Sequence, residues 1–248
     1  MSGHSKWSSI KHKKGLADAK RGRAFTKIIR ELTVAAKNGG GDPNANPRLR
    51  LAMDKAREAN MPKDNVEKAI KRGTGELEGI IYEEVTYEAY APGGVALYVE
   101  ALTDNKNRTT AEVRNLLTKR GGNMAGAGAT AWIFQKKGYL LVDKTKADEE
   151  KLMNTVLEAG ADDLKTEGTS FEITTDPKHF EAVKQALATA KIPTTSAEIT
   201  MLPTSTIRVE GGDAKQVLAL VEALEEQDDV QHVYANFDIP DEILADIT

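Results

Sequence analysis

Apolar side chains recur every three to four positions in three segments of the N-terminal third of the chain, the spacing of amphipathic helices. In the first segment, which starts at Ala17, these positions are Phe25, Ile28, Ile29, Leu32 and Ala36. The second segment opens with Asn46-Pro47, a capping residue and a first-turn proline, and the third runs from near Pro62 to Gly73. The pattern predicts a domain of three short helices over residues 17–79, closed by a linker rich in glycine and glutamate.

The period changes after residue 80, where short apolar or alternating runs bounded by glycine and proline predict strands. The first of these elements are strands at 81–90 and 95–103, a helix at about 108–119 and a strand around Trp132–Phe134. Residues 138–201 then follow the order strand, helix, strand, strand, helix, strand if the polar stretch 161–165 forms a short strand, which is the ferredoxin-like order. A strand, a helix and a strand over 206–235 complete the pattern.

These elements predict an α+β protein with an N-terminal three-helix domain followed by two ferredoxin-like α+β domains, one inserted in the other. The predicted parts are a flexible basic arm (1–16), the helical domain (17–79), an α+β domain made of 80–136 and 203–248, and an inserted ferredoxin-like α+β domain (137–202).

Charge is divided unevenly along the chain, although the formal net charge is only −4. Residues 1–75 hold 18 basic and 7 acidic side chains, whereas residues 76–248 hold 16 basic and 31 acidic ones. Residues 1–37 alone hold 10 basic side chains against Asp18 and Glu31. This asymmetry indicates a front end that binds a polyanion and a body that repels one; a solvated basic face without a partner is the alternative.

The basic region supplies the first set of predicted nucleic-acid-binding residues. Those expected to neutralise phosphates are Lys6, Lys11, Lys13, Lys14, Lys20, Arg21, Arg23, Lys27 and Arg30, with His4 and His12 as further donors. Trp7 is predicted to stack on an unpaired base, or else to pack back onto the helical domain. Sixteen extended residues reach about 50 Å, which suits a groove or a ribosomal cavity.

A second set lies in the body, where residues 104–110 join a strand end to a helix. Its members are Asn105, Arg108, Arg114 and Lys119, which we predict to hold backbone phosphates. The alternative for Asn105 and the neighbouring threonines is a turn and a helix cap.

Enzyme chemistry has no candidate site in the sequence. There is no cysteine, the four histidines have no metal-binding spacing, and no hydrolase or phosphate-loop motif is present. Gly126–Ala131 matches a dinucleotide fingerprint only formally, since it follows a helix and precedes a strand, so we interpret it as a flexible turn. The acidic run Glu225, Glu226, Asp228 and Asp229 is interpreted as solvated surface. We expect no catalytic residue, cofactor, metal or small-molecule substrate, and no membrane segment.

Several short runs resemble the YebC family across almost the whole chain. They include Gly3-His4-Ser5-Lys6-Trp7, Ile10-Lys11-His12-Lys13-Lys14, Asp18-Ala19-Lys20-Arg21, Phe25-Thr26-Lys27, Gly41-Asp42-Pro43, Asn46-Pro47-Arg48-Leu49-Arg50, Asn60-Met61-Pro62-Lys63-Asp64-Asn65 and Thr103-Asp104-Asn105. The resemblance implies a helical N-terminal domain with two α+β domains. It also implies transcription regulation through DNA binding in the cytoplasm or, as in other members, ribosome-associated help in translation.

The residues and the resemblance together predict a cytoplasmic, non-enzymatic nucleic-acid-binding regulator of gene expression, a transcriptional regulatory protein that binds DNA through its basic N-terminal region. One alternative is a ribosome- or ribosomal-RNA-binding translation factor that relieves stalling at difficult sequences. A second alternative, from another class, is a protein-interaction scaffold that acts through the acidic domains.

Overall fold

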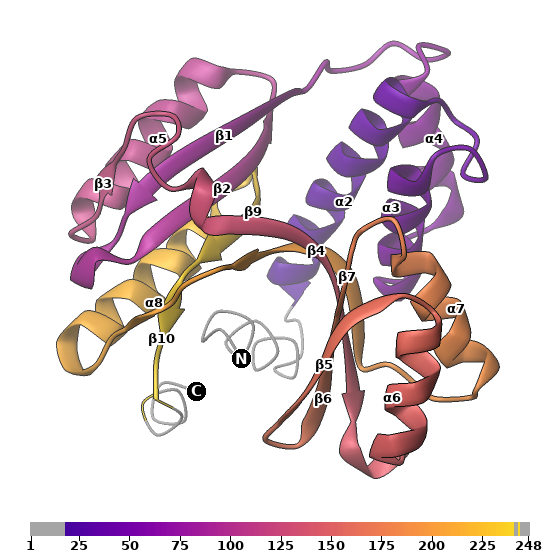
Figure 1. Ribbon diagram of the computed structural model, residues 1–248. Coiled ribbons are helices and arrows are strands. Elements are labelled where there is room, and N and C mark those ends of the chain that lie inside the picture. The colour runs from indigo at the N-terminus through magenta and orange to yellow at the C-terminus, as the bar shows by residue number, and fades with distance from the viewer. Residues whose placement is uncertain (1–17, 241–242, 244–248) are drawn as a thin grey trace. The chain divides into compact units, whose positions relative to one another are not determined.

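The structure is a computed structural model that describes residues 18–240 and 243, with only the backbone given for residues 18–21 (Figure 1). Contacts within the chain group the described residues into two compact units: residues 133–204 form one, and the rest form the other. The fold is α+β, with an N-terminal helical domain followed by antiparallel sheets, as the sequence predicts. Within the described ranges, no helix is both long and apolar enough to cross a membrane.

The helical domain packs two short helices against one long one (Figure 1). Its elements are α2 (Asp18–Gly39), α3 (Pro47–Glu58) and α4 (Lys63–Gly73). Leu32, Leu49 and Ala69, one from each helix, are completely buried in their shared core. The end of α4 lies so close to α2 that a Cβ atom at Gly73 would meet the backbone oxygen of Thr33, which explains the glycine there.

Asn46 joins α2 to α3. Its side-chain oxygen accepts a hydrogen bond from the backbone N–H of Leu49 at 3.0 Å and so caps α3. Its Nδ2 donates to the backbone oxygens of Ala35 and Gly40 near the end of α2, each at 2.8 Å. One buried side chain therefore satisfies backbone groups of two consecutive helices, which sets the turn between them.

The first sheet has the strand order β3-β1-β2-β9, with antiparallel neighbours throughout. Its strands are β1 (Glu83–Tyr90), β2 (Ala96–Thr103), β3 (Asn123–Met124) and β9 (Val230–Ala235). The central strands β1 and β2 are joined directly by a hairpin whose turn contains Gly93 and Gly94, both at positive φ. A short parallel pair, β8 (Ile207–Arg208) with β10 (Phe237–Asp238), lies beside the sheet.

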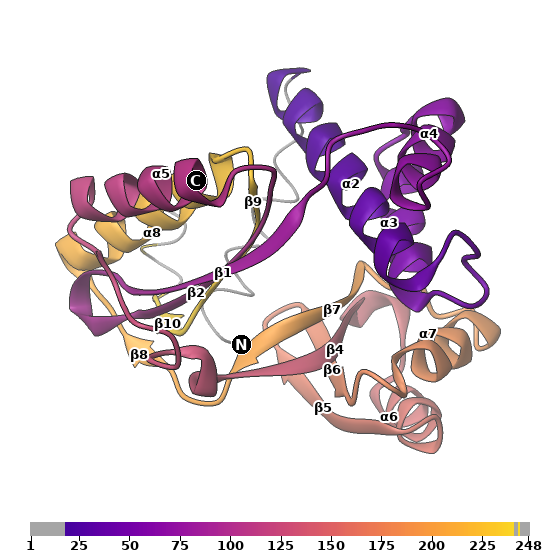
Figure 2. The same ribbon diagram turned by 90° about the horizontal axis from the view of Figure 1, so that it is seen from above.

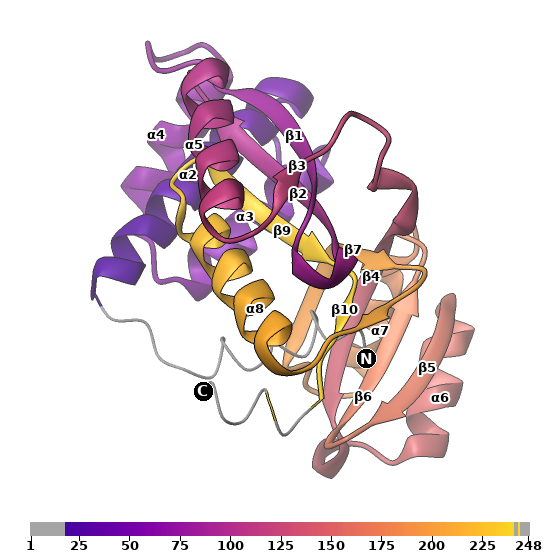
Figure 3. The ribbon, with the colours of Figure 1, turned by 90° about the vertical axis from the view of Figure 1, so that its left-hand side faces the viewer.

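Helices α5 (Lys106–Lys119) and α8 (Gly211–Glu226) lie side by side on one face of this sheet (Figures 2 and 3). Apolar residues of the strands alternate toward these helices. Members of the resulting core that are completely buried include Leu97, Val99, Val113, Leu117, Val217, Leu220, Val221 and Leu224. This shared core holds the start of α5 and the end of α8 in place beside the ends of β2 and β9.

Residues 133–204 form their own four-stranded antiparallel sheet, with the order β5-β6-β4-β7. The elements are β4 (Phe134–Asp143), α6 (Glu149–Glu158), β5 (Ala161–Glu167), β6 (Ser170–Thr175), α7 (Phe180–Thr189) and β7 (Ser196–Pro203). Both helices cover the same face, which is the ferredoxin-like arrangement (Figure 1). At the ends of this unit, Thr204 donates from its backbone N–H to the backbone oxygen of Ile133 at 2.8 Å.

The element predicted around Trp132–Phe134 differs from the structure. Ala131–Ile133 is a single 3₁₀ turn, and β4 is one continuous strand from Phe134 rather than a separate strand that begins at residue 138. Gly138 does not interrupt the strand, because its missing side chain makes room for the side chains of Thr175 and Phe180. The strand predicted over 206–210 is only Ile207–Arg208.

Candidate nucleic-acid interface

Much of the predicted basic region lies outside the described part of the chain. His4, Lys6, Trp7, Lys11, His12, Lys13 and Lys14 are not among the described residues, and of Lys20 and Arg21 only the helical backbone is. Those whose surroundings are described are Arg23, Lys27, Arg30, Asn105, Arg108, Arg114 and Lys119.

Arg23, Lys27 and Arg30 recur at helical spacing, so they lie on one face of α2. This face meets residues 225–229, which run from the last two residues of α8 to the residue before β9. Arg23 is half exposed and its guanidinium lies 3.5 Å from the Glu226 carboxylate. Lys27 is more enclosed and its Nζ donates to the backbone oxygen of Glu225 at 2.5 Å. Burial lowers the pKa of Lys27 to about 8, although the negative charges of Glu225 and Asp228 act to raise it.

Arg30 is largely enclosed, with 12% of its side chain exposed. Its Nη1 lies 2.6 Å from Oδ1 of Asp229 and 2.6 Å from the backbone oxygen of Asp228. The same atom is 3.3 Å from the backbone oxygen of Leu102, and the guanidinium lies 5.4 Å from the centre of the Tyr82 ring. The Arg30 side chain therefore links the helical domain to the ends of β2 and β9.

Asp229 accepts hydrogen bonds from both predicted sets of nucleic-acid-binding residues, from Arg30 of the N-terminal set and from Arg108 of the set in the body. It is 1% exposed, so the expectation that it is solvated surface is wrong. Its Oδ2 accepts hydrogen bonds from Oγ1 of Thr109 at 2.6 Å and from Nη2 of Arg108 at 2.9 Å. Burial alone raises a carboxyl pKa, but these hydrogen bonds and the charges of Arg30 and Arg108 outweigh it, and the pKa of Asp229 falls to about 2.

Arg108 and Asn105 sit at the start of α5. Asn105 accepts a hydrogen bond from the backbone N–H of Arg108 at 3.1 Å, which makes it the cap of this helix. The Arg108 guanidinium reaches both Asp229 and Asp104, the latter at 2.7 Å, yet 42% of its side chain stays exposed. The hydrogen bonds that Arg108 donates to these two carboxylates raise its pKa.

Arg114 and Lys119 lie further along α5 and are exposed. Nη2 of Arg114 contacts Sδ of Met124 in β3 at 3.8 Å. The structure thus brings Arg30 and Arg108 together on one carboxylate, while Arg114 is directed toward β3.

A second buried carboxylate, Glu88 on β1, was missed by the sequence reasoning. It accepts backbone N–H bonds from Gly128 at 2.6 Å, Thr130 at 2.5 Å and Ala131 at 2.8 Å. Burial alone raises a carboxyl pKa, but these bonds outweigh it and lower the pKa of Glu88. The loop Gly126–Ala131, which the sequence analysis interprets as a flexible turn, is therefore held by hydrogen bonds to the buried Glu88 carboxylate. The signals in the sequence that could have indicated this contact are the charged residue within the strand and the later loop of small residues.

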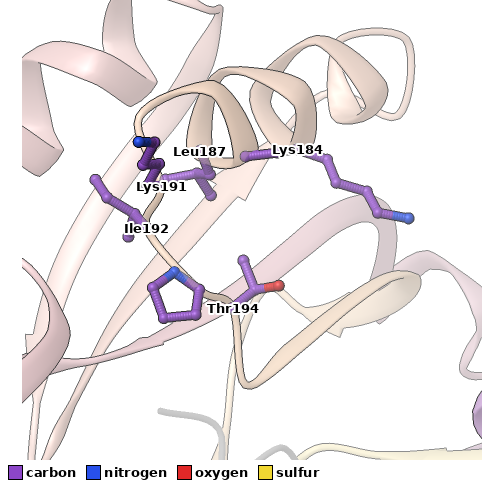
Figure 4. A pocket seen from close by; sticks show the side chains of 7 residues that line it. Lys184, Leu187, Lys191, Ile192 and Thr194 are labelled. Carbon is purple, nitrogen blue, oxygen red and sulfur yellow. The ribbon is translucent and has the colours of Figure 1, made fainter.

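Two open surface depressions lie in the unit 133–204. One is lined by residues at the end of α7 and just after it, where the Lys184 and Lys191 side chains extend in opposite directions (Figure 4). It holds no converging set of polar groups. Among the described residues, no three or more histidine or acidic side chains cluster so that they could hold a metal ion.

Comparison with known proteins covers nearly the full length of the chain. Residues 5–76 match the family model described as the TACO1/YebC protein N-terminal domain, and residues 82–237 match the model described as the TACO1/YebC second and third domain.

Individual relatives are similar over their whole length. A protein of Geobacter sulfurreducens named "Probable transcriptional regulatory protein" is 59% identical over 242 residues, 98% of each chain. One of the same name from Natranaerobius thermophilus is 55% identical over 247 residues, 98% of this chain and 99% of the other. A crystal structure of a conserved hypothetical protein from Aquifex aeolicus superimposes with a TM-score of 0.81 at 49% identity, covering 92% of this chain and 94% of that one.

Proposed function

Since the chain belongs to the TACO1/YebC family, we propose that it is a regulator of gene expression that binds DNA through its basic N-terminal region. The division of charge carries this proposal: the first 37 residues hold 10 basic side chains and two acidic ones, whereas the body is strongly acidic. Repulsion between that body and a phosphate backbone directs contact to the N-terminal region. The names of the relatives support a regulatory role.

The contacts of α2 narrow the set of residues that bind phosphate. Arg23, Lys27 and Arg30 face residues 225–229, so in this proposal the phosphates are bound by the basic residues that precede them. These are Lys6, Lys11, Lys13, Lys14, Lys20 and Arg21. Six phosphate contacts predict that log affinity for duplex DNA falls with log salt with a slope of about −5.

The test compares the full chain with the triple variant K11Q/K13Q/K14Q in a salt series on promoter DNA. We expect the variant to bind more weakly at low salt and to show a slope smaller by about 3. The matched control is K63Q/K68Q/K71Q, which removes the same charge from exposed positions of α4. Equal losses in the two variants would contradict a specific role for the N-terminal region.

A second candidate function, a ribosome-binding translation factor, is favoured by the lack of helical periodicity before Ala17 and by Trp7, which suits an unpaired base. Cosedimentation with ribosomes distinguishes it. Ribosome binding that is lost in K11Q/K13Q/K14Q, with only weak sequence-independent DNA binding, would replace the transcription proposal. Partner binding that survives this charge removal would favour a protein-interaction scaffold.

A further inference from the structure

Trp132 is the largest of the exposed apolar side chains among the described residues. It is 71% exposed, whereas its neighbours Ile133 and Phe134 are buried. A tryptophan ring gains substantial free energy when it is buried, so its exposure next to a core segment calls for a physical reason.

The ring is exposed but held in a fixed orientation. Its indole Nε1 donates to the backbone oxygen of Ala129 at 3.0 Å, and the hydroxyl of Tyr90 donates to the same oxygen at 3.1 Å. Ala129 lies between Gly128 and Thr130, whose backbone N–H groups bind Glu88. The Glu88 carboxylate thereby fixes the loop, and the loop fixes the ring.

The approach to this loop is open. A Cβ atom at Gly126 or at Gly128 would have no neighbour within 4 Å, so the loop is uncovered at these two positions. No charged residue occurs between Arg120 and Trp132.

The sequence around Trp132 also differs in charge from the rest of the body. Residues 105–132 hold five basic side chains and one acidic one, while the remaining residues of 76–248 hold 11 basic and 30 acidic ones. Of the five, Lys106, Arg108, Arg114 and Lys119 are exposed. This stretch of the sequence therefore carries net positive charge, unlike the body as a whole, and favours a phosphate backbone.

We infer that Trp132 is a stacking site for an unpaired base of a single-stranded nucleic acid. The inference rests on the proposed function and deepens it: the N-terminal region supplies electrostatic affinity for the nucleic acid, and the indole adds affinity wherever a bound base is unpaired. A preorganised aromatic ring stacks on any base, so the site is tolerant of sequence. DNA and RNA single strands share this chemistry.

The test uses the full chain and fluorescein-labelled twelve-nucleotide strands of dT and of U, the same dT strand made abasic, and a DNA duplex. We expect W132A to bind the intact strands roughly tenfold more weakly and the abasic strand and duplex unchanged. W132F retains most of the affinity because phenylalanine still stacks. L157A is the control, because Leu157 is also an exposed apolar residue. A stronger loss on U than on dT would identify RNA as the source of the base.

Intrinsic fluorescence gives an independent measurement that does not depend on the folding of W132A. Trp7 and Trp132 are the two tryptophans of the chain, so W7F leaves Trp132 as the reporter. We expect intact strands to quench its emission and the abasic strand not to.

Equal affinity of W132A and wild type, or equal losses on intact and abasic strands, overturns the inference. If K11Q/K13Q/K14Q still abolishes binding in that case, the proposed function stands; if wild type binds no nucleic acid, both fall.

Discussion

Asp229 and Glu88 are buried carboxylates of the same unit, but their charges are stabilised by different kinds of group. Asp229 is bound by side chains from distant parts of the sequence, above all Arg30 and Arg108. Glu88 is bound mainly by backbone N–H groups of one loop, those of Gly128, Thr130 and Ala131. The first arrangement joins the helical domain to the sheet, and the second shapes a single loop. Side-chain partners can be deleted individually, whereas backbone donors persist through most substitutions.

The largest effect is expected from Asp229→Ala. It leaves two buried or half-buried guanidinium groups and the Thr109 hydroxyl without their acceptor, which is expected to lower the free energy of unfolding by about 3–5 kcal/mol. Urea denaturation measures the loss. Glu226→Ala is the control, because that carboxylate is half exposed. A similar small loss in both variants would show that Asp229 does not hold the domain in place.

Glu88→Gln is expected to have a smaller global effect and a sharper local one. The amide replaces one acceptor oxygen with a donor that faces backbone N–H groups, at a cost of about 1.5–3 kcal/mol. Hydrogen exchange should accelerate at the amides of Gly128, Thr130 and Ala131 and remain unchanged in α2. Glu158→Gln, at an exposed position on α6, should leave these rates unaltered. Unchanged exchange in the loop would mean that Glu88 does not fasten it.

Lowering the pH is expected to remove the stability that Asp229 and Glu88 contribute to the fold. Their pKa values in the folded chain lie below the usual range, at about 2 for Asp229, so the stability that they contribute is present above about pH 4 and is lost as the pH falls toward 2. Thermal unfolding between about pH 5 and pH 2 measures this loss. Because Asp229→Ala and Glu88→Gln each remove one titrating group, each variant should show a shallower dependence than wild type. Parallel curves would contradict the lowered pKa values.

Arg23→Ala should have the smallest effect. Its ion pair with Glu226 is half exposed, so the expected loss is below about 1 kcal/mol and should vanish at high salt. Urea denaturation at low and high salt tests both points. A loss that persists at high salt would indicate that Arg23 contributes by packing rather than by charge.

Helices and most strands were predictable because local signals define them. Periodicity and caps such as Asn46 placed the helices, and strand alternation gave the two sheet regions. Neither buried carboxylate was predictable in the same way. Asp229 lies in a polar run that resembles surface, and its partner Arg30 is 199 residues away in the sequence. Glu88 alternates with Tyr87 and Ala89 of the core, so it belongs to the opposite face of the strand; the loop that covers it comes some 40 residues later.

The hydrogen bond between Thr204 and Ile133 has a consequence for how the chain accommodates an additional folded unit. Seventy-two residues separate the host segments, yet these residues begin and end at neighbouring points. Once residues 133–204 have folded, the rest of the unit that carries them loses only the conformational entropy of closing a short connection, because the two ends of the insert are already close together. Replacing residues 133–204 with a few glycines is therefore expected to leave the host able to fold around its own sheet.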